Sequence, residues 1–132
     1  MFETDIKNKV FLITGVNGQL GISLCETIIG LGGKIIGLDL DFKEIIKISK
    51  NKRWEKNNYI FLKNDITDQK LLKKSFTLGL KKYHEINYLI NNAAVSIFSS
   101  WKNRTEKELD LVTGVNIKGA LNCIKTYAKF LK

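Results

Sequence analysis

Proline is absent from this sequence of 132 residues, cysteine occurs twice and histidine once. Two cysteines and one histidine supply neither a disulfide framework nor the ligand set of a structural zinc site. We therefore expect Cys25 and Cys123 to be reduced thiols, and we expect no metal site. Because His84 is the single histidine, a Ser/His/Asp triad would depend on one residue at a predicted helix–strand junction, and hydrolytic chemistry is not favoured.

No apolar run approaches the ~20 residues that a membrane-spanning helix needs. Residues 1–7 carry acidic side chains where a secretory signal is basic, and no apolar segment precedes Lys7. These absences predict a cytoplasmic protein without a membrane partner. The composition, 44% hydrophobic and 27% charged, is typical of a soluble globular chain. The length predicts one domain over residues 1–132.

Acidic residues are few, 13 against 22 basic ones, so the formal net charge is +9. Arginine is scarce as well, with only Arg53 and Arg104. A lone basic domain that binds nucleic acid usually clusters arginine or alternates lysine with exposed aromatic residues. Here the lysines lie on predicted helix faces, which favours solvated surfaces. Nucleic-acid binding therefore stays as a less favoured alternative.

The hydrophobic pattern predicts four buried strands that alternate with amphipathic helices. The strands are expected at residues 10–14, 34–38, 59–62 and 87–90. The helices are expected at 19–31, 42–50, 67–83 with Thr67 as N-cap, and from 105 or 106 to the end, with a bend near 114–116. Strands that are apolar on both faces indicate an α/β fold, a Rossmann-like doubly wound parallel sheet flanked by helices. Right-handed crossovers give the strand order 3-2-1-4.

The turn after the first strand carries glycine at positions 15, 18 and 21. In a dinucleotide-binding turn, Gly15 would allow a sharp bend, and Gly18 would let a diphosphate approach the backbone. Gly21 would let the first helix pack closely on the sheet. The free N–H groups at the start of the helix attract phosphate. We therefore predict a dinucleotide-binding turn, with a purely structural strand–helix turn as the alternative.

Asp39 ends the second predicted strand, 18 residues after Gly21, close to the ~20 residues typical of a ribose-binding acid. A carboxylate accepts hydrogen bonds from both ribose hydroxyls. It repels the 2′-phosphate of NADP by ~1 kcal/mol in water and ~4 kcal/mol at a partly screened surface. NAD is therefore the predicted cofactor, and NADP is less favoured. Asp41 is the alternative acid, or the cap of the helix that begins near Phe42, and Lys43 is the nearest cation.

Taken in order, these motifs resemble those of the short-chain dehydrogenase/reductase family. The matching segments are residues 14–21, Asp39, 64–68 (Asn-Asp-Ile-Thr-Asp), 91–94 (Asn-Asn-Ala-Ala) and 115–119 (Val-Asn-Ile-Lys-Gly). The resemblance implies NAD-dependent hydride transfer between a nicotinamide and an alcohol or carbonyl of a small-molecule substrate, in a homo-oligomer. It implies cofactor contacts from Gly15, Asn17, Gly18, Gln19, Leu20, Gly21, Asp39, Asp65, Ile66, Asn92, Ala93 and Ala94, with Asn91 mainly structural.

Among the family's catalytic residues, only the asparagine of the proton relay has a match, Asn116. The family's tyrosine and lysine, four positions apart, have none. Tyr59 and Lys63 have that spacing but stand in the third predicted strand rather than in the helix after a fifth. The resemblance implies a cofactor-binding portion of an oxidoreductase, incomplete relative to the family, truncated before the serine, tyrosine and lysine, and inactive alone. A non-catalytic nucleotide-binding or interaction module is the alternative.

Two expectations concern subgroup and assembly. Gln19 stands where compact members of the family have glycine, as in extended members, whereas residues 91–94 match compact members. The subgroup and the substrate therefore remain open. The last predicted helix carries apolar side chains that would lack partners, which favours self-association. These side chains are Leu109, Val112, Leu121, Ile124 and Phe130.

Overall fold

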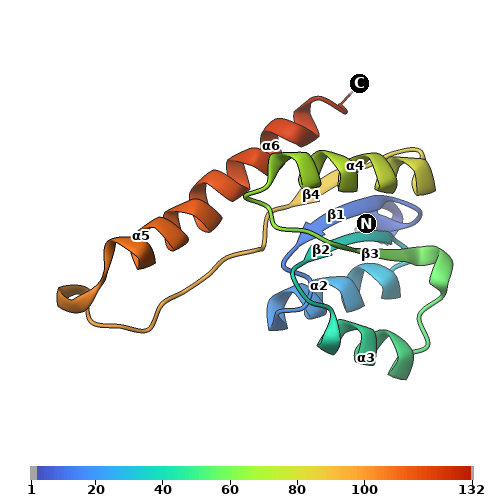
Figure 1. The fold of residues 1–132 in the computed structure, drawn as a ribbon. Helices are drawn as coiled ribbons and strands as arrows, with labels where there is room; N and C mark the ends of the chain where they lie inside the picture. The colour runs from blue at the N-terminus through green and yellow to red at the C-terminus, as the bar shows by residue number, and fades with distance from the viewer. Residues whose placement is uncertain (1–2, 132) are drawn as a thin grey trace.

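The computed structural model describes residues 3–131 and contains a four-stranded parallel sheet with helices on both faces (Figure 1). The strands are β1 (Val10–Thr14), β2 (Lys34–Asp39), β3 (Tyr59–Lys63) and β4 (Tyr88–Ile90). Their order is β3-β2-β1-β4, and each neighbouring pair is parallel. The predicted α/β class and the 3-2-1-4 order are therefore confirmed.

Helices connect the strands and cover the sheet. The α-helices are α1 (Glu3–Ile6), α2 (Gln19–Gly30), α3 (Lys43–Asn51), α4 (Gln69–Tyr83), α5 (Glu106–Thr113) and α6 (Ala120–Ala128). Short 3₁₀ turns occupy Lys56–Asn58 and Trp101–Asn103, and a π-helical segment occupies Gly114–Gly119. In Figure 1, α4 and α6 lie on one side of the sheet, and α2 and α3 lie on the other.

The central strand β1 divides its side chains between two cores, because successive residues of a strand point to opposite faces. Val10 and Leu12 join the core beneath α4 and α6, where Phe76 is fully buried. Phe11 and Ile13 join the core beneath α2 and α3. All five residues of β1 are buried, as expected of a strand covered on both faces.

Helix α2 ends where the glycines at 32 and 33 predict, because Gly32, just after the helix, has a positive φ of 77°. The predicted cap of α4 is wrong. Asp68, not Thr67, caps this helix, and its side chain accepts hydrogen bonds from the backbone N–H groups of Lys70 and Leu71. Thr67 instead donates from its backbone and its hydroxyl to Asp65 Oδ1, at 2.9 and 2.7 Å.

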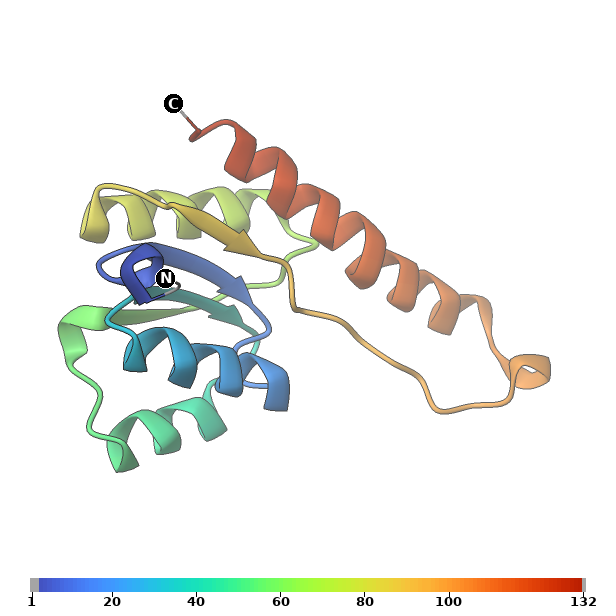
Figure 2. The same ribbon diagram turned by 180° about the vertical axis from the view of Figure 1, so that it is seen from behind.

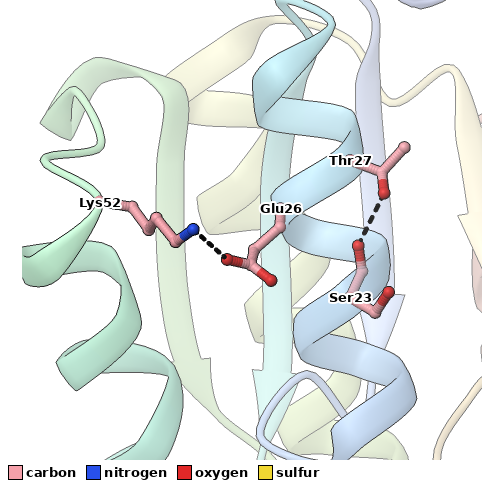
Figure 3. Close-up of polar contacts among 4 residues, drawn as sticks. All are labelled: Ser23, Glu26, Thr27 and Lys52. Carbon is pink, nitrogen blue, oxygen red and sulfur yellow. Dashed lines mark hydrogen bonds and ion pairs between the residues drawn. The ribbon is translucent and has the colours of Figure 1, made fainter.

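One surface ion pair links α2 and α3 (Figure 3): Lys52 Nζ lies 3.7 Å from Glu26 Oε1. The lysine side chain is 64% exposed, and such pairs contribute ~0–1 kcal/mol to stability. On the side of α2 that faces away from α3, the Thr27 hydroxyl donates to the carbonyl of Ser23 at 2.9 Å. The α2–α3 layer is therefore held mainly by its buried core, in which Ile45 is fully enclosed.

The predicted bend of the last helix takes the form of the π-helical segment Gly114–Gly119, which joins α5 to α6. Thr105 caps α5 in a capping box with Glu108, within the predicted range for the start of this helix. The prediction that the helix continues to the end is wrong. α6 ends at Ala128, where the backbone closes a turn, and Lys132 lies outside the described residues.

Candidate functional site

A cavity of about 430 Å³ lies at the carboxyl ends of the strands, within the range typical of small-molecule sites. We name it the strand-end cavity. It is lined by Gly15, Gly18, Gln19, Leu20, Gly21, Leu38, Asp39, Leu40, Asn64, Asp65, Ile66, Asn92, Ala93, Ala94, Val95 and Val115. Every predicted cofactor residue except Asn17 is in this set. In open α/β sheets, ligands bind at this end, where the strand order reverses.

The glycine-rich turn forms one wall of the strand-end cavity. Gly15 has a φ of 71° and donates from its N–H to the Leu38 carbonyl at 2.8 Å. A side chain at Gly21 would place its Cβ 2.1 Å from the Gly15 oxygen, so the helix can approach the turn only without one. A Cβ at Gly18 would meet only the Gly15 oxygen, at 3.6 Å. The fold thus leaves open space beside Gly18, which lines the cavity and is the N-cap residue of α2.

The loop after β4 is pinned to this turn by a buried hydroxyl. Thr14 Oγ1 accepts hydrogen bonds from the backbone N–H groups of Asn92 and Ala93, at 3.1 and 3.0 Å. The Asn92 side chain donates to the carbonyls of Thr14 and Gly15, at 3.1 and 2.9 Å. Asn91 donates to the Ala120 carbonyl at 3.3 Å and does not line the cavity, as expected of a structural residue.

Asp39 presents an oriented carboxylate to the strand-end cavity. Its Oδ2 accepts from the backbone N–H of Asn17 at 2.8 Å, and its Oδ1 accepts from that of Leu40 at 2.7 Å. A carboxylate has about four acceptor positions, so each oxygen can accept a further hydrogen bond. Asp41, the alternative acid, lies outside the cavity lining and accepts from the backbone N–H groups of Phe42 and Lys43 instead.

Asn17 is predicted to contact the cofactor, and it is not among the residues that line the cavity. Its side-chain oxygen accepts from the backbone N–H groups of Glu44 and Ile45, at 2.9 and 3.0 Å. These groups belong to the first turn of α3, whose N-cap residue Phe42 makes no side-chain capping bond. The amide is therefore turned toward α3 and away from the cavity, because the unsatisfied N–H groups of that helix need an acceptor.

The adenine-side wall predicted at Asp65 and Ile66 is braced by buried asparagines. Asn64 donates to the Ser75 hydroxyl at 2.8 Å, and Asn122 donates to the Ile66 carbonyl at 3.1 Å. Sequence reasoning missed five residues of the cavity lining. They are Leu38, Leu40, Asn64, Val95 and Val115. Each of them adjoins a predicted site residue in the sequence, so adjacency to a motif was the signal that could have found them.

Asn116, the predicted residue of a proton relay, lies in the π-helical segment and holds the loop after β4. Its Oδ1 accepts from the Val95 N–H at 2.8 Å, and its Nδ2 donates to the Val95 carbonyl at 2.9 Å. Tyr59 and Lys63 stand at opposite ends of β3, and neither lines the cavity. Their spacing therefore does not create a tyrosine–lysine pair at this site.

The ionisable side chains of the cavity lining are Asp39 and Asp65. Burial raises the pKa of the Cys25 thiol to about 12 and that of Cys123 to about 11, and neither thiol lines the cavity. Across residues 3–131, no cluster of three or more potential His, Cys, Asp or Glu ligands is placed to hold a metal. None of the helices in that range has the length and apolarity to cross a bilayer. The two carboxylates of the lining can accept hydrogen bonds from a polar ligand.

Comparison with known families gives the assignment. A model described as short chain dehydrogenase matches residues 9–132. The chain belongs to this family. The matched region contains the glycine-rich turn, Asp39, the asparagine loop after β4 and Asn116, which together surround or support the strand-end cavity.

Relatives and solved structures of this family match 90% or more of the chain. An uncharacterized oxidoreductase of Listeria monocytogenes is 29% identical over 119 residues, which cover 90% of this chain and 48% of the relative. A short-chain dehydrogenase of Leptospira borgpetersenii with bound NAD+ superimposes with a TM-score of 0.80 at 27% identity, covering 98% of this chain and 48% of that one. One from Burkholderia phymatum in complex with NAD has a TM-score of 0.87 at 23% identity, covering 99% and 46%. The chain thus spans about half the length of these proteins.

Proposed function

We propose that this chain forms the NAD-binding part of an oxidoreductase that transfers a hydride between a nicotinamide and an alcohol or carbonyl of a small-molecule substrate. One observation carries the proposal: the Asp39 carboxylate and the open glycine position 18 line the same cavity. The two neighbouring short-chain dehydrogenases with bound NAD support the choice of cofactor. The family and its oxidoreductase relatives support the reaction class.

The residues of the cavity suit the chemistry of NAD. Open space beside Gly18 and the start of α2 suits a diphosphate, since the first N–H groups of a helix lack partners within it. The Asp39 carboxylate suits the ribose hydroxyls, and Asp65 with Ile66 would border the adenine. When bound, NAD would supply the hydride acceptor. The protein's own contribution is to hold the diphosphate and the ribose and to orient them against the asparagine loop.

A nucleotide-binding module without catalysis is the second candidate, and one observation favours it. The pair at the family's tyrosine–lysine spacing, Tyr59 and Lys63, lies along β3 outside the cavity. Under this candidate, NAD binds but the chain reduces no carbonyl compound. Under the first candidate, the binding part contributes to hydride transfer once the family's serine, tyrosine and lysine are present.

Isothermal titration of the purified chain with NAD+ and NADP+ tests the cofactor proposal. We expect NAD+ to bind more tightly, because the Asp39 carboxylate repels the 2′-phosphate. Asp39→Ala should weaken NAD+ binding about tenfold or more, since it removes hydrogen bonds to a charged acceptor, and should reduce the preference over NADP+. Asp110→Ala, an exposed acid on α5, is the matched control. Tighter binding of NADP+ to the wild type, or an unchanged NAD+ affinity in Asp39→Ala, would contradict the proposal.

A further inference from the structure

We infer that Asn17 is a positioning residue for the ribose-binding carboxylate of Asp39, and that it acts by anchoring the glycine-rich turn to the start of α3. This inference rests on the proposed function, because it assigns to Asn17 a role in NAD binding that requires no contact with NAD. Three sets of contacts carry it: those of the Asn17 side chain, those of its backbone N–H, and the packing of the residues on either side.

The Asn17 side chain acts as a helix cap supplied from a distant part of the chain. Its Oδ1 accepts from the N–H groups of Glu44 and Ile45, which are 27 and 28 residues away. These are the second and third residues of α3, the positions that an ordinary N-cap side chain satisfies. The N-cap residue itself, Phe42, makes no side-chain capping bond. Asn17 thus performs the capping that Phe42 cannot.

The backbone of Asn17 contacts the carboxylate that the site depends on. Its N–H donates to Asp39 Oδ2 at 2.8 Å, while the Leu40 N–H donates to Oδ1 at 2.7 Å. The orientation of the carboxylate is therefore set by two donors from two segments. The Leu40 donor is the next residue along the chain, whereas the Asn17 donor belongs to the turn. The position of the turn thus determines whether Oδ2 keeps its place.

The surroundings of residue 17 make the side-chain anchor important. Val16 is fully buried and fixes one side of the turn. On the other side, Gly18, Gln19 and Leu20 are exposed, and position 18 has open space around it. The two hydrogen bonds from α3 to the Asn17 side chain therefore hold the turn at the residue that follows the last buried one, Val16. Loss of these bonds would release the N–H of residue 17 from Asp39.

An amide suits this position better than a carboxylate. Asn17 Nδ2 lies 3.5 Å from Asp41 Oδ2, and Asp39 is bonded to the backbone of the same residue. An aspartate at position 17 would place a third negative charge beside these two acids, and like charges this close repel. The asparagine supplies the acceptor for α3 and faces Asp41 with a donor.

A double-mutant cycle on NAD+ affinity tests the inference. Asn17→Ala should weaken NAD+ binding about threefold to tenfold when Asp39 is present, and less than about twofold in the Asp39→Ala background, since residues that act through one another are not additive. Thr105→Ala is the matched control. It removes the capping side chain of α5, a helix outside the cavity, and should lower stability without changing NAD+ affinity. Asn17→Ser, which keeps an oxygen on a shorter side chain, should fall between wild type and Asn17→Ala and serves if the alanine variant does not fold.

Amide hydrogen exchange gives a readout that needs no ligand. In Asn17→Ala, the amides of Glu44, Ile45 and residue 17 should exchange faster, while that of Leu40 should change least. Unchanged exchange at Glu44 and Ile45, or equal effects of Asn17→Ala with and without Asp39, would overturn the inference while leaving NAD binding intact. Failure of the wild-type chain to bind NAD+ at all would instead overturn the proposed function, and the inference with it.

Discussion

The sheet region, residues 10–94, and the distal arm, residues 95–131, differ in how much of their apolar surface is covered. All five residues of β1 and the central four of β2 are buried, whereas α5 has no buried residue. Figure 2 shows α5 extending away from the sheet, while α6 returns over it beside α4. Residues 10–94 therefore build most of the strand-end cavity, and the arm adds Val95 and Val115 to its lining.

Large apolar side chains on the distal arm face solvent. Phe98 is 99% exposed, Trp101 is 76% exposed, and Ile117 and Leu121 are each 58% exposed. Large apolar side chains exposed along one segment are typical of interaction surfaces in soluble proteins. They agree with the expectation, made from the sequence, that the chain self-associates through this part. The strand-end cavity depends mainly on the better packed sheet region.

The arm is tied to the sheet region by core packing, in which Cys123 of α6 is fully buried and Phe130 stacks on Phe76, and also by polar contacts. The Tyr127 hydroxyl donates to the Asn87 carbonyl at 2.6 Å, and Asn122 donates to that of Ile66. Nearer the cavity, Asn116 holds Val95 through both of its amide atoms. The base of the arm thus belongs to the cofactor site, whereas its distal end does not.

Glycine-to-alanine substitutions should separate the two regions most strongly. At Gly21 the new Cβ would meet the Gly15 oxygen at 2.1 Å and the Val16 Cα at 2.7 Å, and backbone at this distance must move. We expect a loss of about 2–3 kcal/mol or more in the free energy of unfolding. Gly114→Ala in the arm meets nothing within 4 Å, and should be neutral or stabilising by up to about 1 kcal/mol. Urea unfolding measures both changes. Equal losses in the free energy of unfolding for the two variants would contradict a difference in packing between the two regions.

Gly18→Ala should separate an effect on NAD+ binding from an effect on folding within the sheet region. Gly18→Ala adds a Cβ that meets only the Gly15 oxygen at 3.6 Å, so the chain should fold normally. The same Cβ enters the space proposed for the diphosphate, and NAD+ affinity should fall about tenfold, which corresponds to ~1.4 kcal/mol. Gly30→Ala, with nothing within 4 Å, is the control for titration calorimetry. Undiminished NAD+ binding by Gly18→Ala would remove this position from the site.

The buried thiols, one in each region, predict how stability depends on pH. The pKa of Cys25 in α2 is raised from 9.0 to about 12, and that of Cys123 in α6 from 9.0 to about 11, both by burial. Above pH 9 the unfolded chain loses these protons first, so the free energy of unfolding should fall as pH rises. We expect a fall of about 1 kcal/mol per thiol by pH 10.

The matched variants for this prediction are Cys25→Ala and Cys123→Ala, studied by urea unfolding from pH 7 to pH 11. Each should show a shallower fall than the wild type. Between pH 10 and 11 the fall should be reduced more by Cys25→Ala, because that thiol has the higher pKa in the folded chain. Parallel curves for all three proteins would contradict the burial of both thiols.

The smallest expected change in stability is on the surface of the arm. Ile117→Lys combined with Leu121→Lys alters side chains that are each 58% exposed, and should change the free energy of unfolding by no more than about 0.5 kcal/mol. Sedimentation velocity should nevertheless show reduced self-association. Leu78→Lys, at a 39% exposed position on α4, is the control. An identical distribution of species in the double variant and the wild type would show that Ile117 and Leu121 are not part of the contact between copies.

Local patterns in the sequence predicted most of the fold, because each pattern has a local physical cause. The four apolar segments became strands of the expected order, and Glu106, one of the two predicted starts of the last helix, begins α5. Where two polar residues competed, the local pattern failed: Asp68 caps α4, while Thr67 is engaged by Asp65. The acid Asp65, four residues before the first residue of α4, decided between them, and helix propensity alone does not express such a contact.

The site was predictable where its residues follow a motif, and not where long-range contacts decide. The glycine turn, Asp39 and the asparagine loop all meet at the strand-end cavity, because parallel strands bring their carboxyl ends together. The role of Asn17 depends on α3, 27 residues away, and nothing in its immediate sequence indicates that contact. The bracing of Ile66 by Asn122 spans 56 residues and was equally hidden.

NAD binding in the strand-end cavity can be measured by a nuclear magnetic resonance titration of the amide-labelled chain with NAD+. We expect saturable shifts in the amides of residues 15–21, 39–40, 65–66 and 92–95, with little change beyond residue 119. Shifts confined to the lysine-rich face of α4 or to the distal arm, or no saturable shift at any amide, would contradict it.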